Sequence, residues 1–365
     1  MSLKCGIVGL PNVGKSTLFN TLTKAINAQA ENFPFCTIEP NIGIITVPDE
    51  RLNKLEELVV PEKVIPTTVE LVDIAGLVKG ASKGEGLGNM FLGNIRSVDA
   101  IVHVIRCFED ENVIHVDGSI NPIRDKEVID TELQFKDLES LEKFVTKNQK
   151  AAKSGDKVAK KNVEVGQKYI DHLLTGKSAR SLEIDDDSKL FIKDLNLLTI
   201  KPTLYACNVD ENSAVSGNAF VDQVRAVAEA EGAELLIISA KVESEIVMMD
   251  AEDQEMFLED LGLTESGMDR LIKASYKLLD LETYFTAGVK EVRAWTIHKN
   301  TKAPQAAGVI HTDFEKGFIR AEVIAYNDYV ELGSEAACRD KGKLRVEGKE
   351  YVVQDGDILH FRFNV

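Results

Sequence analysis

The chain has 365 residues, enough for two or three domains with sizeable cores. Its hydrophobic share of 44% and charged share of 28% are typical of a soluble globular protein, and because no run of about 18 apolar residues occurs, a membrane-spanning helix is not expected. A formal net charge of -17 excludes nucleic-acid binding over the whole surface but leaves room for a local basic patch.

The cysteines predict a reducing compartment. All five lie far apart without a C-x-x-C pair, which indicates free thiols in a cytoplasmic protein and no zinc site. Cys5, Cys107 and Cys207 lie in apolar strand-like runs and are expected to be buried. A predicted strand begins within a few residues of Met1, so no signal peptide is expected.

The first elements read as strand, loop and helix over 3–8, 9–16 and 17–24. The loop has the pattern G-x-x-x-x-G-K-[ST], whose glycines allow backbone N–H groups to surround a polyphosphate. In such a loop Lys15 reaches the terminal phosphates and the Ser16 hydroxyl holds Mg²⁺. The strand before it and the helix after it are the context that makes the motif convincing.

The next segments continue an alternation of strands and helices. Residues 32–40 contain two prolines and predict a loop. Strands are expected at 43–47, 67–73 and 100–106, and a helix at 51–59. The glycine-dense stretch that follows the second of these strands, at 78–89, predicts a mobile loop.

From about residue 125 to 196 the composition shifts to Lys, Glu, Ala, Leu and Gln with helical periodicity. We expect an antiparallel helical hairpin, inserted as residues 126–198. Residues 143–168 hold eight lysines against Asp156 and Glu164, a local charge of +6 that leaves -23 for the rest of the chain. A solvated coiled-coil face and a contact with RNA or a ribosome explain this basic tip equally well.

The alternation resumes after the hairpin. Strands are predicted at 203–208 and 235–240, and helices at 220–231 and 267–279. This order implies a mostly parallel sheet with helices on both faces, in a nucleotide-binding domain of residues 1–125 and 199–280.

Residues 281–365 have a different character and predict a small, separate β-rich domain. A plausible hairpin turn lies at Glu347–Gly348. Short strands are expected at 292–297, 318–324, 343–346, 351–353 and 357–363.

Polar groups fall at the ends of several predicted parallel strands, where α/β sheets bind ligands. Asp73 is placed to hold Mg²⁺ through a water, and the Gly76 N–H to approach the γ-phosphate. Thr37 completes the metal ligands. The box 208–211 is expected to read the base, with Ser239 at the tip of the next strand. Each box is weak alone, but their joint order is the GTPase-type layout.

Two residues depart from that layout. The usual guanine reader is N-K-x-D, whose Asp accepts hydrogen bonds from guanine, but here Val209 and Glu211 stand at the Lys and Asp positions. This removes a bias against adenine and makes guanine selectivity doubtful. Leu77 stands where many GTPases place a glutamine that orients water, so unaided hydrolysis is expected to be slow.

Together with Phe33–Thr37, these motifs resemble YchF, the Obg-like ATPase family. The resemblance covers essentially the whole chain, including the helical insertion and a C-terminal domain similar to a TGS domain of β-grasp type. It implies hydrolysis of ATP in preference to GTP through the N-x-x-E box. It also implies Mg²⁺ as cofactor and an association with ribosomes and stress responses.

The resemblance, together with the strand-end placement, assigns roles residue by residue. Asn12 is similar to an asparagine that some related GTPases use to bind an activating potassium ion, although a structural turn residue is at least as compatible. The expected nucleotide-binding residues are Asn12, Val13, Gly14, Lys15, Ser16, Thr17, Asn208, Val209, Glu211 and Ser239. The expected metal ligands are Ser16, Thr37 and Asp73, and the expected catalytic residues are Lys15, Gly76 and His115.

The leading hypothesis is therefore a slow, Mg²⁺-dependent ATPase that acts as a molecular switch on a ribosome or ribosomal RNA, without a membrane partner and favoured as a monomer. One alternative is a GTP-specific enzyme of the Obg group. A second is a nucleotide-gated binding module whose hydrolysis is incidental, which Leu77 favours.

Overall fold

The structure is a computed structural model that describes residues 3–30, 38–39, 41–74, 87–115 and 118–364. The chain forms two compact units. The first unit comprises Met1–Asn27, Ile38–Gly43 and Glu70–Leu271; the second comprises Ala28–Thr37, Ile44–Val69 and Ile272–Val365. The second unit thus includes residues 44–69 as well as the C-terminal residues. The division into a nucleotide-binding domain, a helical insertion and a C-terminal domain stays a prediction. No helix among the described residues combines the length and apolar character that a membrane crossing requires.

A seven-stranded sheet has the order β2-β3-β5-β1-β6-β7-β8, with β3 and β5 running from one unit into the other. β1 lies between β5 and β6 and is parallel to both, and β7 and β8 continue the parallel arrangement. The mostly parallel GTPase-type sheet predicted from the sequence is confirmed. The strands are β1 (Lys4–Val8), β2 (Ile38–Glu39), β3 (Ile42–Thr46), β5 (Thr68–Asp73), β6 (Ala100–Arg106), β7 (Thr203–Asn208) and β8 (Glu234–Ile238).

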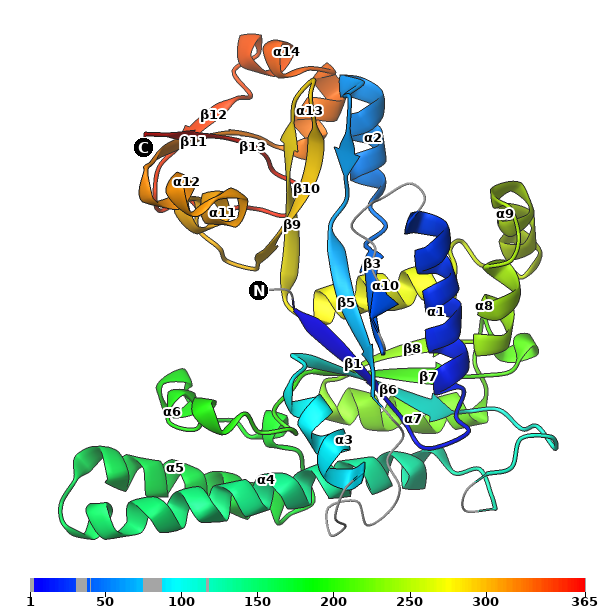
Figure 1. The fold of residues 1–365 in the computed structure, drawn as a ribbon, viewed down its shortest axis with the longest axis vertical. Coiled ribbons are helices and arrows are strands. Elements are labelled where there is room, and N and C mark those ends of the chain that lie inside the picture. Colours follow the sequence, from blue (N-terminus) through cyan, green and yellow to red (C-terminus); the bar gives the residue numbers. More distant parts are fainter. Residues whose placement is uncertain (1–2, 31–37, 40, 75–86, 116–117, 365) are drawn as a thin grey trace. The chain divides into compact units, whose positions relative to one another are not determined.

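Helices cover both faces of this sheet, with α1 and α7 on opposite sides (Figure 1). α7 packs Val221 and Val224 against Tyr205 and Cys207 of β7 in a buried hydrophobic cluster. Cys5, Cys107 and Cys207 are buried, as predicted, and form no disulfide bond with a described residue. The helices of this unit outside the insertion are α1 (Lys15–Ala30), α3 (Leu87–Arg96), α7 (Ala219–Glu231), α8 (Ala240–Ile246), α9 (Ala251–Asp260) and α10 (Gly267–Leu278), of which α1 and α10 extend into the second unit.

The helical insertion is a hairpin of α4 (Pro122–Lys153) and α5 (Lys157–Leu173), as the periodicity predicts. Asn121 caps the start of α4 by accepting a hydrogen bond from the Arg124 N–H, and a proline follows at the first helical position. Gly155, at φ 93°, makes the reversal between the helices. The chain returns to the sheet through η1 (Ala179–Ser181), α6 (Asp186–Leu190) and η2 (Lys193–Leu195).

A buried polar network joins the insertion to the sheet. Glu231, at the end of α7, accepts hydrogen bonds from Lys126 of α4, from Arg180 and from the Tyr205 hydroxyl. The three partners satisfy a carboxylate that would be costly to bury alone. His103 packs against Tyr205 in the same layer, and burial lowers its pKa to about 4, so its ring is neutral at pH 7.

The second unit contains a six-stranded mixed sheet with the order β12-β11-β13-β9-β10-β4. One face packs on α11 through three alanines and Tyr284, and the other packs on α2 through Leu52, Leu55 and Phe285. The strands are β4 (Val64–Ile65), β9 (Leu281–Ala287), β10 (Val292–His298), β11 (Phe318–Ile324), β12 (Arg345–Glu347) and β13 (Ile358–Phe363). The helices are α2 (Glu50–Val59), α11 (Ala303–Ile310), α12 (Thr312–Lys316), α13 (Tyr326–Leu332) and α14 (Glu335–Asp340).

The predicted hairpin at Glu347–Gly348 is wrong. β12 pairs with β11, and residues 351–353 form a single bridge to Lys302 instead of a strand. The Ala303 N–H donates to the Tyr351 carbonyl, so this segment is held by the start of α11. The apolar run 351–353 therefore reflects packing on α11, which the sequence pattern alone does not distinguish from a strand.

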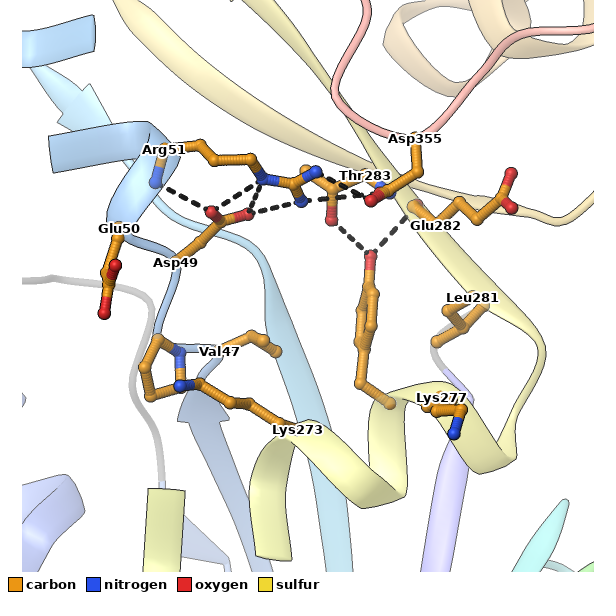
Figure 2. Close-up of a pocket in the computed structure, with 12 residues that line it drawn as sticks. Val47, Asp49, Glu50, Arg51, Lys273, Lys277, Leu281, Glu282, Thr283 and Asp355 are labelled. Atoms are coloured by element: carbon orange, nitrogen blue, oxygen red, sulfur yellow. Dashed lines mark hydrogen bonds and ion pairs between the residues drawn. The ribbon is translucent and has the colours of Figure 1, made fainter. Parts of the chain in front are cut away.

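Charged side chains tie the start of α2 to the loop before β13 (Figure 2). The Arg51 guanidinium donates to both carboxylate oxygens of Asp49 and, at 2.7 Å, to Asp355, whose other oxygen accepts the Thr283 N–H. These residues line a cleft of about 540 Å³. Arg51 thus bridges two carboxylates. This bridge helps to hold residues 44–69 to the C-terminal part of the second unit.

Replacing Arg51 with Met should destabilise the second unit by about 2 kcal/mol, because two neighbouring carboxylates lose the guanidinium that both accept from. Chemical denaturation followed by the fluorescence of the single tryptophan, Trp295, measures the change. Lys54→Met on the same helix removes an exposed pair with Glu57 and should leave the midpoint unchanged. Equal midpoints for the Arg51 variant and the wild type would contradict the role given to the bridge.

Candidate functional site

A cavity of about 890 Å³ opens at the carboxyl end of the parallel strands. It collects segments that follow β1, β6, β7 and β8, which is where the sequence analysis places a ligand. Its lining residues are Leu10, Pro11, Asn12, Gly14, Lys15, Ser16, Thr17, Phe108, Glu109, Asp110, Val113, Asn208, Val209, Asp210, Glu211, Asn212, Ala240, Lys241 and Ser244.

The phosphate loop between β1 and α1 has two residues with positive φ, Asn12 at 63° and Gly14 at 93°. A Cβ on Gly14 would lie 2.1 Å from the Asn208 amide nitrogen, so only glycine fits there. α1 begins at Lys15 directly after this turn, which points its first N–H groups toward the cavity. Ser16 and Thr17 are exposed and line the cavity.

Asn208 connects three parts of the site. Its side-chain nitrogen donates to the Val13 carbonyl at 2.9 Å, and its side-chain oxygen accepts the Ala240 N–H at 2.9 Å. The residue is 3% exposed, so water cannot easily replace either bond. Asn208 therefore positions the phosphate loop, and Val13 contributes its carbonyl to this bond. Ser239 is buried and does not line the cavity, although Ala240 and Lys241 do.

The base box distributes its two carboxylates between different tasks. Asp210 caps η3 (Glu211–Ser213) by accepting hydrogen bonds from the Ser213 N–H and hydroxyl. Glu211 is about half exposed and lies 3.8 Å from the Lys241 ammonium. The Val209 N–H is already donated to the Ile238 carbonyl. On this side of the cavity Asp210 is thus engaged in capping η3, and Glu211 is the carboxylate that lies near Lys241.

Lys15 is buried, and its ammonium donates to the carboxylate of Asp73 at the end of β5. The Ser16 hydroxyl and the Asp73 carboxylate are hard oxygen donors, which suits Mg²⁺, an ion that binds few protein ligands and takes its other oxygens from water and phosphates. No group of three or more His, Cys, Asp or Glu side chains in the described ranges could hold a metal alone. The predicted sites Thr37, Gly76 and Leu77, and most of the glycine-rich stretch 78–89, lie outside the described residues.

His115 lies beyond the cavity lining. Its Nε2 is 2.7 Å from the Asp125 carboxylate in the first turn of α4, and both side chains are buried. The neighbouring Ile114 carbonyl accepts a hydrogen bond from the Asn12 side chain of the phosphate loop. The segment that carries His115 is thus bonded on one side to the phosphate loop and on the other to the helical insertion.

One wall of the cavity contains none of the residues predicted from the sequence. Phe108, Glu109, Asp110 and Val113 follow β6, and Arg106 at the end of that strand donates hydrogen bonds to three carbonyls of this segment. The rule that ligands bind beyond the carboxyl ends of parallel strands applies to β6 as it does to its neighbours. Because residues 107–113 match no motif, only their position after a strand could have pointed to them.

The sheet order, with the phosphate loop after β1 and the base box after β7 at the same edge of the sheet, defines a GTPase-type phosphate-loop protein. A family profile described as "50S ribosome-binding GTPase" matches residues 4–150, and one described as "Protein of unknown function (DUF933)", named YchF-GTPase_C, matches residues 281–364.

The chain is similar over its full length to proteins named ribosome-binding ATPase YchF. Identity is 57% to that of Pasteurella multocida and 54% to that of Escherichia coli O157:H7, each over 365 residues and 100% of both chains. The solved structure of the Schizosaccharomyces pombe YchF GTPase superposes with a TM-score of 0.90 at 40% identity, covering 99% of this chain and 98% of that chain. The chain belongs to the YchF family, which confirms the resemblance drawn from its motifs.

Proposed function

We propose that this protein is a slow, Mg²⁺-dependent ATPase that acts as a nucleotide-controlled switch on the ribosome. Full-length relatives named ribosome-binding ATPases support a ribosome-associated nucleotide hydrolase. We infer the metal dependence, the slow turnover and the ribosome-facing surface from the residues of this chain.

The base box carries the preference for ATP. Guanine presents an acceptor, O6, where adenine presents a donor, the N6 amine. The Val209 N–H is engaged by Ile238, so this residue offers a base its carbonyl oxygen, which attracts an amine and repels O6. Glu211 is longer by one methylene than the aspartate that reads guanine, and it lies near Lys241. Both features favour adenine.

The phosphate end supports magnesium-assisted hydrolysis. Ser16 and Asp73 would hold Mg²⁺, joined by the predicted ligand Thr37, and the metal would neutralise charge on the phosphate oxygens. Lys15 and the Gly76 N–H would stabilise charge on the terminal phosphate. Leu77 cannot orient a water, so we expect slow turnover until a further group acts. The same leucine favours a second candidate function, a nucleotide-gated binding module with incidental hydrolysis.

Competition between nucleotides tests the base assignment. We expect ATP to bind at least tenfold more tightly than GTP in calorimetric titrations with Mg²⁺. Glu211→Asp should narrow that ratio, because it brings the carboxylate back toward the guanine-reading position. Asp210→Asn is the matched control and should leave the ratio unchanged, since Asp210 caps η3. A tenfold preference for GTP in the wild type would establish the GTPase alternative instead.

His115 is proposed to assist hydrolysis, and its bond to Asp125 offers a way to test this. We expect His115→Ala to slow single-turnover ATP hydrolysis by about 100-fold, the usual scale for a lost proton-transfer group, with ATP affinity unchanged. Asp125→Asn keeps the ring but removes the carboxylate that orients it, so a smaller loss is expected. Normal single-turnover rates in His115→Ala would remove His115 from catalysis.

The basic tip of the hairpin is proposed as the ribosome- or RNA-facing surface. Lys143, Lys161 and Lys168 pair with glutamates on their own helices. Five lysines form no ion pair with any described residue: Lys147, Lys150, Lys153, Lys157 and Lys160. Such a cluster of unpaired lysines can bind the phosphate backbone of RNA, whereas the net negative charge of the rest of the chain would repel RNA.

Replacing Lys150, Lys153, Lys157, Lys160 and Lys161 with Ala should weaken ribosome co-sedimentation at least tenfold at 50 mM salt and flatten its salt dependence, because fewer counterions are released on binding. Alanines at Lys24, Lys189 and Lys193, which are exposed lysines outside the tip, serve as the control and should change binding little. Unchanged co-sedimentation of the tip variant would leave the tip as a solvated helix face.

A further inference from the structure

Arg106 is a buried cation whose hydrogen bonds include no carboxylate in the part of the chain that the structure describes. It ends β6 and is 1% exposed. Its guanidinium donates to the carbonyl oxygens of Phe108 at 3.2 Å, Val113 at 2.9 Å and Asp110 at 3.4 Å. Burial lowers the pKa of Arg106. Neutral carbonyls offset the desolvation of a guanidinium only in part, so placing this cation here costs stability that a buried apolar side chain would not cost.

The three acceptors all belong to one wall of the nucleotide cavity. Residues 108–113 have no regular secondary structure, and 109–112 are exposed to solvent, so the segment has little packing of its own. Within it, the Asn112 N–H donates to the Asp110 carboxylate and the Val113 N–H to the Asp110 carbonyl. A planar group with five donors can fasten several carbonyls in one geometry, which an ammonium cannot do.

The guanidinium also lies 4.5 Å from the centre of the Phe108 ring, within the range of a cation–π contact. Phe108, Asp110 and Val113 line the cavity together with the base box, whereas the phosphate loop is fastened separately by Asn208. The wall beside the base and the cradle beneath the phosphates thus depend mainly on two different buried side chains, and one bond, from the Asn12 side chain to the Ile114 carbonyl, joins them.

We propose that Arg106 is a positioning residue that preforms this wall, so that it sets the affinity for the base and ribose of the nucleotide and leaves the affinity for the phosphates unaffected. The proposal rests on the proposed function, since it assumes that the cavity takes a whole nucleotide. Arg106 touches no ligand itself and acts through the three carbonyls and the Phe108 ring.

The test compares two ligands on one variant. Arg106→Lys keeps the charge but cannot hold three separated carbonyls. Calorimetric titration should show ATP and ADP binding at least tenfold more weakly to this variant, and inorganic tripolyphosphate binding within twofold of the wild type. Arg180→Lys is the matched control: Arg180 is another largely buried arginine of this unit, bonded to Tyr205 and Glu231 outside the cavity, and its variant should change neither affinity.

Equal weakening for ATP and tripolyphosphate would make Arg106 a general structural residue and overturn the proposal, as would unchanged ATP binding. A wild type that binds tripolyphosphate but not ATP would instead overturn the proposed function. Hydrogen exchange of the backbone amides of residues 108–114 in the intact wild-type protein is a second test, which needs no variant. A preformed wall predicts protection at Asn112 and Val113 without nucleotide and little gain with ATP; protection that appears only with ATP would contradict preformation.

Discussion

The candidate site depends first on one buried amide. Asn208 joins the phosphate loop, the tip of β7 and the start of α8 through two hydrogen bonds of 2.9 Å, and Gly14 has no Cβ because that amide occupies the space. The Asn208 side chain has one donor group and one acceptor, so each end holds a different strand tip. The phosphate loop and the base box therefore have a fixed spacing before any ligand binds, which reduces the ordering cost of binding a nucleotide.

The segment after β6, residues 106–115, is held in place by side-chain hydrogen bonds in the same way. Arg106 and Asn12 hold two successive parts of the segment 106–115, and His115 ends it on Asp125 of α4. Two hydrogen bonds on adjacent residues, Ile114 and His115, thus connect the phosphate loop to the first turn of α4. The basic tip lies at the other end of the α4–α5 hairpin. The base of this hairpin is therefore bonded to the nucleotide site, and its tip is the proposed ribosome contact.

Local patterns predicted most of the first unit because each element carries its own signal. Residues 100–106 and 203–208 are mostly apolar runs of strand length, and the structure has strands with these bounds. The second unit was harder to predict. Strand β9 follows α10 after only two residues, and the helices α11 to α14 are short, so their periodicity is weak. Residues 351–353 are apolar and β-prone as in a strand, yet they are held by the start of α11.

The sequence by itself determined the phosphate loop, the base box and their order along the chain, because residue type and spacing decide which backbone turns and which ligand oxygens are possible. Only the tertiary structure decided how the side chains divide their work. Asp210 and Glu211 are both carboxylates beside a strand end, but one caps η3 and the other lies near Lys241. Arg106 belongs to no motif, and its role arises from three carbonyls that only the folded loop brings within reach of its guanidinium.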